Sequence, residues 1–223
     1  MKNFILLKNF FLKKDFLRLQ KIICKILSLK FYSNVDKNFK EINKFFFSQN
    51  NKKLSLIYDN LNSSTKLKKF ITNNKFFINK LKKNLKIKNL NFFKYQILLM
   101  KPRDNKENLG WHTDLLYYPK YKNKKFFVVY FNILNEKKNT LDVVKNTNVE
   151  KLKFAENLFS QRKKVKLNHR GKYYIKNNFT KKQITSCKLN TYDLLLFHKN
   201  LVHRSSKNTF NGFRMTYIIR VSN

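Results

Sequence analysis

The first part of the chain has apolar residues that recur every three or four positions, which is the pattern of helices with one buried face. This spacing is clearest in Phe16, Leu19, Ile22, Ile23, Ile26 and Leu27. Further helices are expected over about residues 37 to 49, 51 to 60, 65 to 72 and 75 to 85, and Ser63-Ser64-Thr65 is a capping-like start for the helix at 65 to 72. We expect these helices to brace a sheet.

After Leu90 the pattern changes to short apolar runs, rich in aromatic and β-branched residues, which predict strands. The runs are Phe92 to Met100, Phe126 to Leu134, Leu141 to Val144, Tyr173 to Ile175, Leu194 to Phe197 and Phe213 to Val221. Several strands without intervening helices favour a sandwich or barrel. The predicted fold class is α+β with a mainly β core. A helical region, residues 1–90, packs on a core of residues 91–223 within one structural domain, and the polar stretch 145–172 is a candidate lid.

Composition changes this picture little. The chain has 223 residues, 42% of them hydrophobic, and a formal charge of +38 that would ordinarily suggest a nucleic-acid or membrane-surface partner. Only seven of the 50 basic residues are arginine, and lysine occurs in every region. A nucleic-acid groove usually concentrates arginine, so we interpret the charge as a solvated basic surface that attracts anionic ligands.

The two cysteines, Cys24 and Cys187, lie far apart and neither belongs to a C-x-x-C pair. This disfavours a disulfide framework or a zinc knuckle and indicates buried free thiols in a reducing cytoplasm. No stretch approaches the roughly 18 uncharged apolar residues that a transmembrane segment needs. The sequence therefore predicts a soluble cytoplasmic protein.

The chemistry is concentrated in His112, Asp114 and His203, with Arg214 following His203 by 11 residues. On an extended backbone the first and third residues of His112-Thr113-Asp114 point to the same side. His203, 91 residues after His112, would come from a distant strand, as the strands of a jelly-roll barrel do. Two imidazoles and one carboxylate can bind one face of a ferrous ion. We interpret the remaining histidines, His198 and His169, as structural or loop residues.

Three segments resemble the phytanoyl-CoA dioxygenase family of iron(II) and 2-oxoglutarate-dependent oxygenases, and the resemblance covers roughly residues 50 to 222. They are Gly110-Trp111-His112-Thr113-Asp114, the stretch from Tyr192-Asp193 through His203-Arg204-Ser205-Ser206-Lys207-Asn208, and Arg214 at its distance from His203. The resemblance implies a double-stranded β-helix, the cupin-like jelly roll. The stretch 139–148 departs from the family's turn, and Tyr192 replaces its usual glycine.

The resemblance implies that His112, Asp114 and His203 bind Fe(2+) and that Arg214 binds the distal carboxylate of 2-oxoglutarate. Ser205 would be a hydrogen-bonding helper and Tyr130 an aromatic neighbour of this co-substrate. The implied reaction consumes O2, hydroxylates a small organic substrate and releases succinate and CO2, with ascorbate supporting activity. We name Gln96, Lys101, Arg103 and Trp111 as candidate substrate contacts. The positive surface favours an anionic substrate, and a fatty acyl thioester, an amino acid, a sugar and a secondary metabolite all remain open.

Two alternatives remain open, the first within the same chemistry and the second from another class. A nucleic-acid demethylase resembling the AlkB family would also have an H-x-D pair, a distal histidine and two arginines, for which Arg214 and Arg220 are candidates. The 91-residue gap is long and the His203 to Arg214 interval short for that family, and Arg220 is otherwise expected to be a surface residue at a strand end. The second alternative is a jelly-roll binding protein without catalytic activity.

Overall fold

The computed structural model describes residues 4–103, 110–134, 139–145, 151–156, 173–206, 208–209 and 211–223. The helical part contains β1 (Phe4–Leu7), α1 (Lys13–Ile26), α2 (Val35–Phe47), α3 (Asn51–Ser63), α4 (Thr65–Thr72) and α5 (Lys75–Leu85). The remaining strands are β2 (Asn91–Met100), β3 (Phe126–Leu134), β4 (Asn139–Val144), β5 (Phe154–Glu156), β6 (Tyr173–Ile175), β7 (Ile184–Lys188), β8 (Leu194–His198), β9 (His203–Ser205) and β10 (Arg214–Ser222). Two short 3-10 helices, η1 (Asp114–Tyr117) and η2 (Pro119–Tyr121), precede β3. Most of the candidate lid, and residues 146–148 of the departing turn, lie outside the described residues.

Side-chain caps explain where most of the helices begin. The residues before α2, α3, α4 and α5 are Asn34, Asn50, Ser64 and Asn74, and each accepts a hydrogen bond from the backbone N–H three residues later. Such a cap stabilises a helix by about 1 kcal/mol. The capping role predicted for the Ser63-Ser64-Thr65 segment is confirmed at Ser64.

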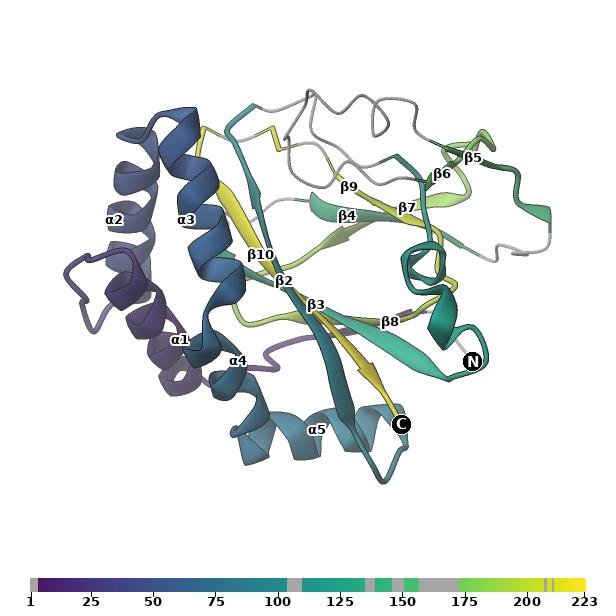
Figure 1. The fold of residues 1–223 in the computed structure, drawn as a ribbon, viewed down its shortest axis with the longest axis horizontal. Coiled ribbons are helices and arrows are strands. Elements are labelled where there is room, and N and C mark those ends of the chain that lie inside the picture. Colours follow the sequence, from purple (N-terminus) through teal and green to yellow (C-terminus); the bar gives the residue numbers. More distant parts are fainter. Residues whose placement is uncertain are drawn as a thin grey trace.

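The sheets are antiparallel and form layers with the helices (Figure 1). A five-stranded sheet has the order β1-β8-β3-β10-β2, a three-stranded sheet the order β7-β4-β9, and β5 pairs with β6. Strand β3 is buried throughout: Phe127, Val129, Phe131 and Ile133 pack in the cluster that contains the helices, whereas Phe126, Val128 and Tyr130 pack with Leu141 and Val143 of β4. The five-stranded sheet is therefore the middle layer, and the α+β class is confirmed.

In the described residues, the region predicted to be helical begins with a strand and not with a helix. Strand β1 pairs with β8, Phe4 opposite Phe197, and adds an edge to the five-stranded sheet. Asp193 fixes the end of this strand, because its carboxylate accepts bonds from Lys8 Nζ at 2.8 Å and from the Asn9 backbone N–H at 3.1 Å. Four residues are too few to distinguish a helix from a strand by periodicity, and pairing with β8 decides the outcome.

At the opposite edge of the sheet, the Asn62 side chain of α3 forms the backbone hydrogen bonds with β2 that a neighbouring strand would form. Asn62 Oδ1 accepts a bond from the Ile97 N–H at 2.7 Å, and Asn62 Nδ2 donates to the Ile97 carbonyl at 3.1 Å. These bonds satisfy part of an edge that would otherwise be open to pairing with another chain.

Two further predictions can be checked in the described residues. Cys24 and Cys187 are both buried and form no disulfide, as predicted, and burial raises the pKa of the Cys187 thiol to about 11. None of the helices in the described ranges combines the length and the apolar character that crossing a bilayer requires.

Candidate metal centre

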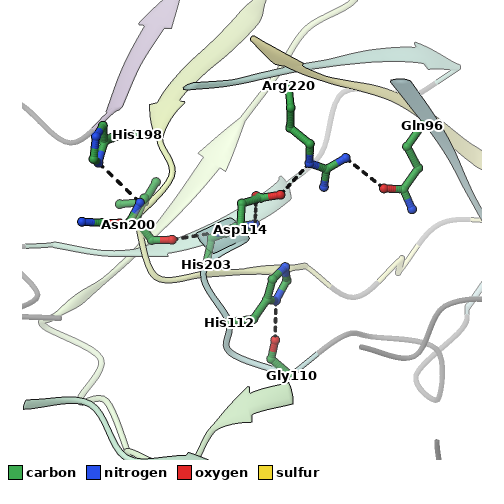
Figure 2. A network of polar contacts seen from close by, with 9 residues as sticks. Gln96, Gly110, His112, Asp114, His198, Asn200, His203 and Arg220 are labelled. Carbon is green, nitrogen blue, oxygen red and sulfur yellow. Dashed lines mark hydrogen bonds and ion pairs between the residues drawn. The ribbon is translucent and has the colours of Figure 1, made fainter. Parts of the chain in front are cut away.

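The two histidines of the predicted site lie side by side because their backbones pair. His112 and His203 form an antiparallel bridge with N–H to O distances of 3.0 and 2.9 Å between the donor nitrogen and the acceptor oxygen. Their ring centroids are 4.3 Å apart. Asp114 follows at the start of η1, and Figure 2 shows its carboxylate directed toward the same region. The structure thus brings together three side chains from two distant segments.

Backbone carbonyls fix the protonation pattern of both rings. His112 Nδ1 lies 2.8 Å from the Gly110 carbonyl oxygen, and His203 Nδ1 lies 2.9 Å from the Leu201 carbonyl oxygen. A carbonyl can only accept, so each Nδ1 carries the proton and each Nε2 has a free lone pair. This arrangement is typical of metal-binding histidines, whose second nitrogen is oriented by a carbonyl or carboxylate.

Asp114 is 1% exposed, and its two oxygens differ. Oδ1 accepts a short bond of 2.6 Å from Arg220 Nε. Oδ2 lies 3.4 Å from His203 Nε2 and is buried, with no hydrogen-bond partner among the described residues. A buried carboxylate oxygen without a partner is costly unless something compensates it, and a cation beside His203 Nε2 would do so.

Electrostatics keep these groups in the protonation states that a metal requires. Burial, together with the neighbouring His203, lowers the pKa of His112 to about 3, and burial also lowers the pKa of His203. Burial by itself would raise the pKa of Asp114, but the charge and hydrogen bond of Arg220 together with the neighbouring His203 and His112 outweigh it, and the pKa of the carboxyl is lowered. Near neutral pH the site therefore holds two neutral imidazoles and one carboxylate.

The donor set suits a ferrous ion, whereas the side chains are not yet arranged around one point. Among the described residues, no group of three or more His, Cys, Asp or Glu side chains is already placed for metal coordination. His203 Nε2 and Asp114 Oδ2, at 3.4 Å, have about the separation that two ligands of one ion show, since each bond measures about 2.0–2.2 Å. Coordination by all three groups therefore requires an adjustment of side chains.

Arg214 lies on the same face of β10 as Arg220, because an interval of six residues preserves the side on a strand. It is 2% exposed, its Nη2 donates to the Ser206 carbonyl at 2.8 Å, and it contacts the sulfur of Met100. Burial raises the pKa of Tyr130, and the nearby charge of Arg214 partly offsets this effect. Arg214 and Tyr130 thus lie near one another, while Ser205 is buried in β9 opposite Leu141.

The candidate substrate contacts are scattered. Gln96 accepts a bond from Arg220 Nη1 at 3.0 Å and so belongs to the Asp114 network. Trp111 packs against Phe179 and under the Arg204 guanidinium, 4.3 Å from the ring centroid. Lys101 and Arg103 donate to asparagine side chains at exposed positions. The structure therefore does not gather these four residues around one ligand.

The structure describes two further residues considered from the sequence, His198 and Arg220. His198 accepts a bond from the Asn200 N–H at 3.4 Å and is not part of the His112–His203 pair; His169 lies outside the described residues. The expectation that Arg220 is a surface residue is wrong. It is 7% exposed, and its ion pair with Asp114 explains why a charged side chain is buried there.

Sequence reasoning also missed Lys199. The residue is 6% exposed, and its ammonium group donates to the carbonyls of Tyr121, Lys122 and Lys124 at 3.0, 2.5 and 2.6 Å. The Lys199 backbone carbonyl accepts from the Leu115 N–H. Lys199 thereby fixes the segment that follows Asp114. Nothing in the sequence distinguishes it from the other lysines.

Comparison with known proteins identifies the fold class but no family. No family model and no curated protein matches the chain. Among solved structures, the non-heme monooxygenase ThoJ in its apo form matches with a TM-score of 0.66 at 11% identity, over 100% of this chain and 74% of that protein. The non-heme alpha ketoglutarate dependent epimerase SnoN from nogalamycin biosynthesis matches with a TM-score of 0.55 at 11% identity, over 100% and 77%.

EvdO2 from Micromonospora carbonacea var. aurantiaca, in complex with 2-oxoglutarate, matches with a TM-score of 0.51 at 14% identity, over 74% of this chain and 62% of that one. The chain thus spans less than two thirds of the length of EvdO2. Identities this low establish similarity of fold alone. The chain shares its fold with ThoJ, SnoN and EvdO2.

Proposed function

We propose that this protein is an iron(II)- and 2-oxoglutarate-dependent oxygenase that hydroxylates a small organic substrate, built on a jelly-roll core like that of phytanoyl-CoA dioxygenases. The observation that carries the proposal is the buried Asp114 Oδ2, which lies 3.4 Å from His203 Nε2 and has no hydrogen-bond partner in the part of the chain that the structure describes. Both histidines of the site hold their Nδ1 protons against carbonyls. This combination supports a metal site better than a structural ion pair.

In this proposal His112, His203 and Asp114 hold the iron, which when bound supplies the redox chemistry that couples decarboxylation of 2-oxoglutarate to oxidation of a C–H bond. The atoms balance when one oxygen atom of O2 enters succinate and the other enters the hydroxylated product, with release of CO2. Arg214 binds the distal carboxylate of 2-oxoglutarate by a two-point ion pair. The buried apolar residues around Tyr130, among them Leu195 and Phe197, exclude water from the site.

The basic surface favours an anionic substrate, because a formal charge of +38 raises the local concentration of anions. The same charge leaves a nucleic-acid demethylase as the second candidate. Against it, the two arginines that suggested this activity are 2% and 7% exposed, so they offer no surface to a polyanion. A salt-sensitive affinity for methylated DNA would favour the second candidate.

The test is succinate formation from 2-oxoglutarate with ferrous iron and ascorbate, with and without candidate substrates. We expect slow uncoupled turnover in the natural protein and its loss in His112→Ala and Asp114→Ala. The matched control is His198→Gln, which alters a histidine outside the site and should keep turnover. Absence of succinate, together with absence of metal binding, contradicts the proposal.

A further inference from the structure

We propose that Arg220, held in place by Gln96 and helix α3, is a positioning residue that makes Asp114 a one-oxygen ligand of the metal. The inference rests on the proposed function and extends it, because it assigns a task to residues that bind neither iron nor 2-oxoglutarate. Figure 2 shows the sequence of contacts, from Asp114 through Arg220 to Gln96.

The geometry separates the two carboxylate oxygens. Arg220 Nε donates to Asp114 Oδ1 at 2.6 Å, a length typical of a strong charge-assisted hydrogen bond. Asp114 Oδ2 remains directed to His203 Nε2 at 3.4 Å. A metal that approaches Oδ2 would meet an Oδ1 already committed to the guanidinium, so binding through both oxygens would break that bond.

The guanidinium is itself fixed from behind. Arg220 Nη1 donates to Gln96 Oε1 at 3.0 Å, and the ring of Tyr118 lies under the guanidinium at 5.0 Å. The Gln96 side chain also forms a hydrogen bond with Tyr58 of α3, which counteracts the rise that burial causes in the pKa of Tyr58. One turn later in α3, Asn62 holds the backbone of β2 at Ile97. A continuous path of polar contacts therefore connects α3 to Asp114.

The number of coordination positions on ferrous iron explains why binding through one oxygen of Asp114 matters. Ferrous iron has six positions, and a two-histidine, one-carboxylate face leaves three of them open. A chelating co-substrate would take two of these positions, which would leave the third for oxygen. If Asp114 bound through both oxygens, one open position would be lost. A residue that holds Oδ1 in a hydrogen bond therefore keeps this oxygen from the metal and leaves enough open positions for 2-oxoglutarate and oxygen.

The experiment uses Mn(II) as a probe, because its effect on water-proton relaxation reports how many exchangeable waters it carries. The variants are Arg220→Gln, Gln96→Leu and Tyr58→Phe. The control is Arg204→Gln, because Arg204 forms another arginine–aspartate pair, with Asp142 at 3.2 Å, and its side chain is 41% exposed and makes no contact with Asp114 among the described residues. Mn(II) affinity and relaxation are measured on each folded protein without 2-oxoglutarate.

We expect Arg220→Gln to weaken Mn(II) binding by about 10- to 100-fold, the usual effect of removing a partner of a metal ligand. The bound-water contribution to relaxation should fall by about a third, from three waters to two. Gln96→Leu and Tyr58→Phe should give smaller losses of affinity in the same direction, and Arg204→Gln should match the natural protein.

The outcomes separate the two proposals. If the natural protein does not bind Mn(II) or Fe(II), the proposed function fails and the positioning role fails with it. If it binds metal but Arg220→Gln behaves like Arg204→Gln in affinity and relaxation, only the positioning role is overturned. If Arg220→Gln does not fold, Gln96→Leu decides, because it keeps the ion pair; affinity equal to that of Arg204→Gln overturns the role.

Discussion

Replacing Arg220 by methionine should destabilise the metal-free protein severely, because it leaves the Asp114 carboxylate buried without its counter-ion. Asp114 is 1% exposed, and its Oδ1 accepts a short hydrogen bond of 2.6 Å from Arg220 Nε. Breaking a buried ion pair on one side costs about 3–5 kcal/mol. Loss of the bond from Arg220 to Gln96 adds about 1 kcal/mol. Against a total stability of roughly 5–15 kcal/mol, this is a large fraction.

The assay is equilibrium unfolding in urea, followed by circular dichroism with a chelator present. The double variant Asp114→Asn/Arg220→Met should recover much of the loss, because removing both charges leaves no unpaired ion. The control Arg204→Met breaks a pair in which Arg204 is 41% exposed and Asp142 keeps bonds from two serine hydroxyls, so it should cost about 1 kcal/mol or less. If Arg220→Met costs no more than Arg204→Met, the buried ion pair does not have the importance assigned to it.

Three further predictions follow from the same structure. The pKa of His112 is about 3 in the folded protein and near 6.5 in the unfolded chain, so below pH 6.5 the unfolded chain binds more protons. The free energy of unfolding should therefore fall as pH drops from 6.5 toward 3, by about 1 kcal/mol per pH unit between pH 6 and 5. A His112→Gln variant with the same pH slope would contradict this. Lys199→Met should lower the free energy of unfolding in urea by about 2–4 kcal/mol, since three carbonyls lose a buried donor. The control Lys188→Met, at an exposed position, should change it little, and equal losses would contradict the structural role of Lys199. Arg214→Ala should weaken 2-oxoglutarate binding far more than Fe(II) binding in calorimetric titrations, and an equal loss of both would make Arg214 structural.

The sequence predicts helices and strands well where the segment is long enough to show a repeating pattern of apolar residues. The helices at 65 to 72 and 75 to 85 and the strand Phe126 to Leu134 have the predicted bounds. Strand β1 could not be predicted, because its four residues form a strand only through pairing with β8. Such long-range pairing leaves no local signal.

The same limit applies to the site. His112 and Asp114 are recognisable because their spacing on an extended backbone places them together, whereas the backbone bridge to His203 is visible only in the structure. For Arg220 a signal was present: six residues after Arg214 on a predicted strand, it had to share the face of Arg214. The ion pair that allows it to be buried could not be predicted, since it depends on where η1 places Asp114.

The most direct test of the proposed function is an anaerobic titration of the metal-free protein with ferrous iron and then 2-oxoglutarate, followed by visible absorption. We predict a weak absorption band that appears only when both are present, saturates at one equivalent of each, and is absent in Asp114→Ala. If the natural protein gives no band and binds neither iron nor 2-oxoglutarate, the fold has been kept without the oxygenase chemistry, and the central claim is wrong.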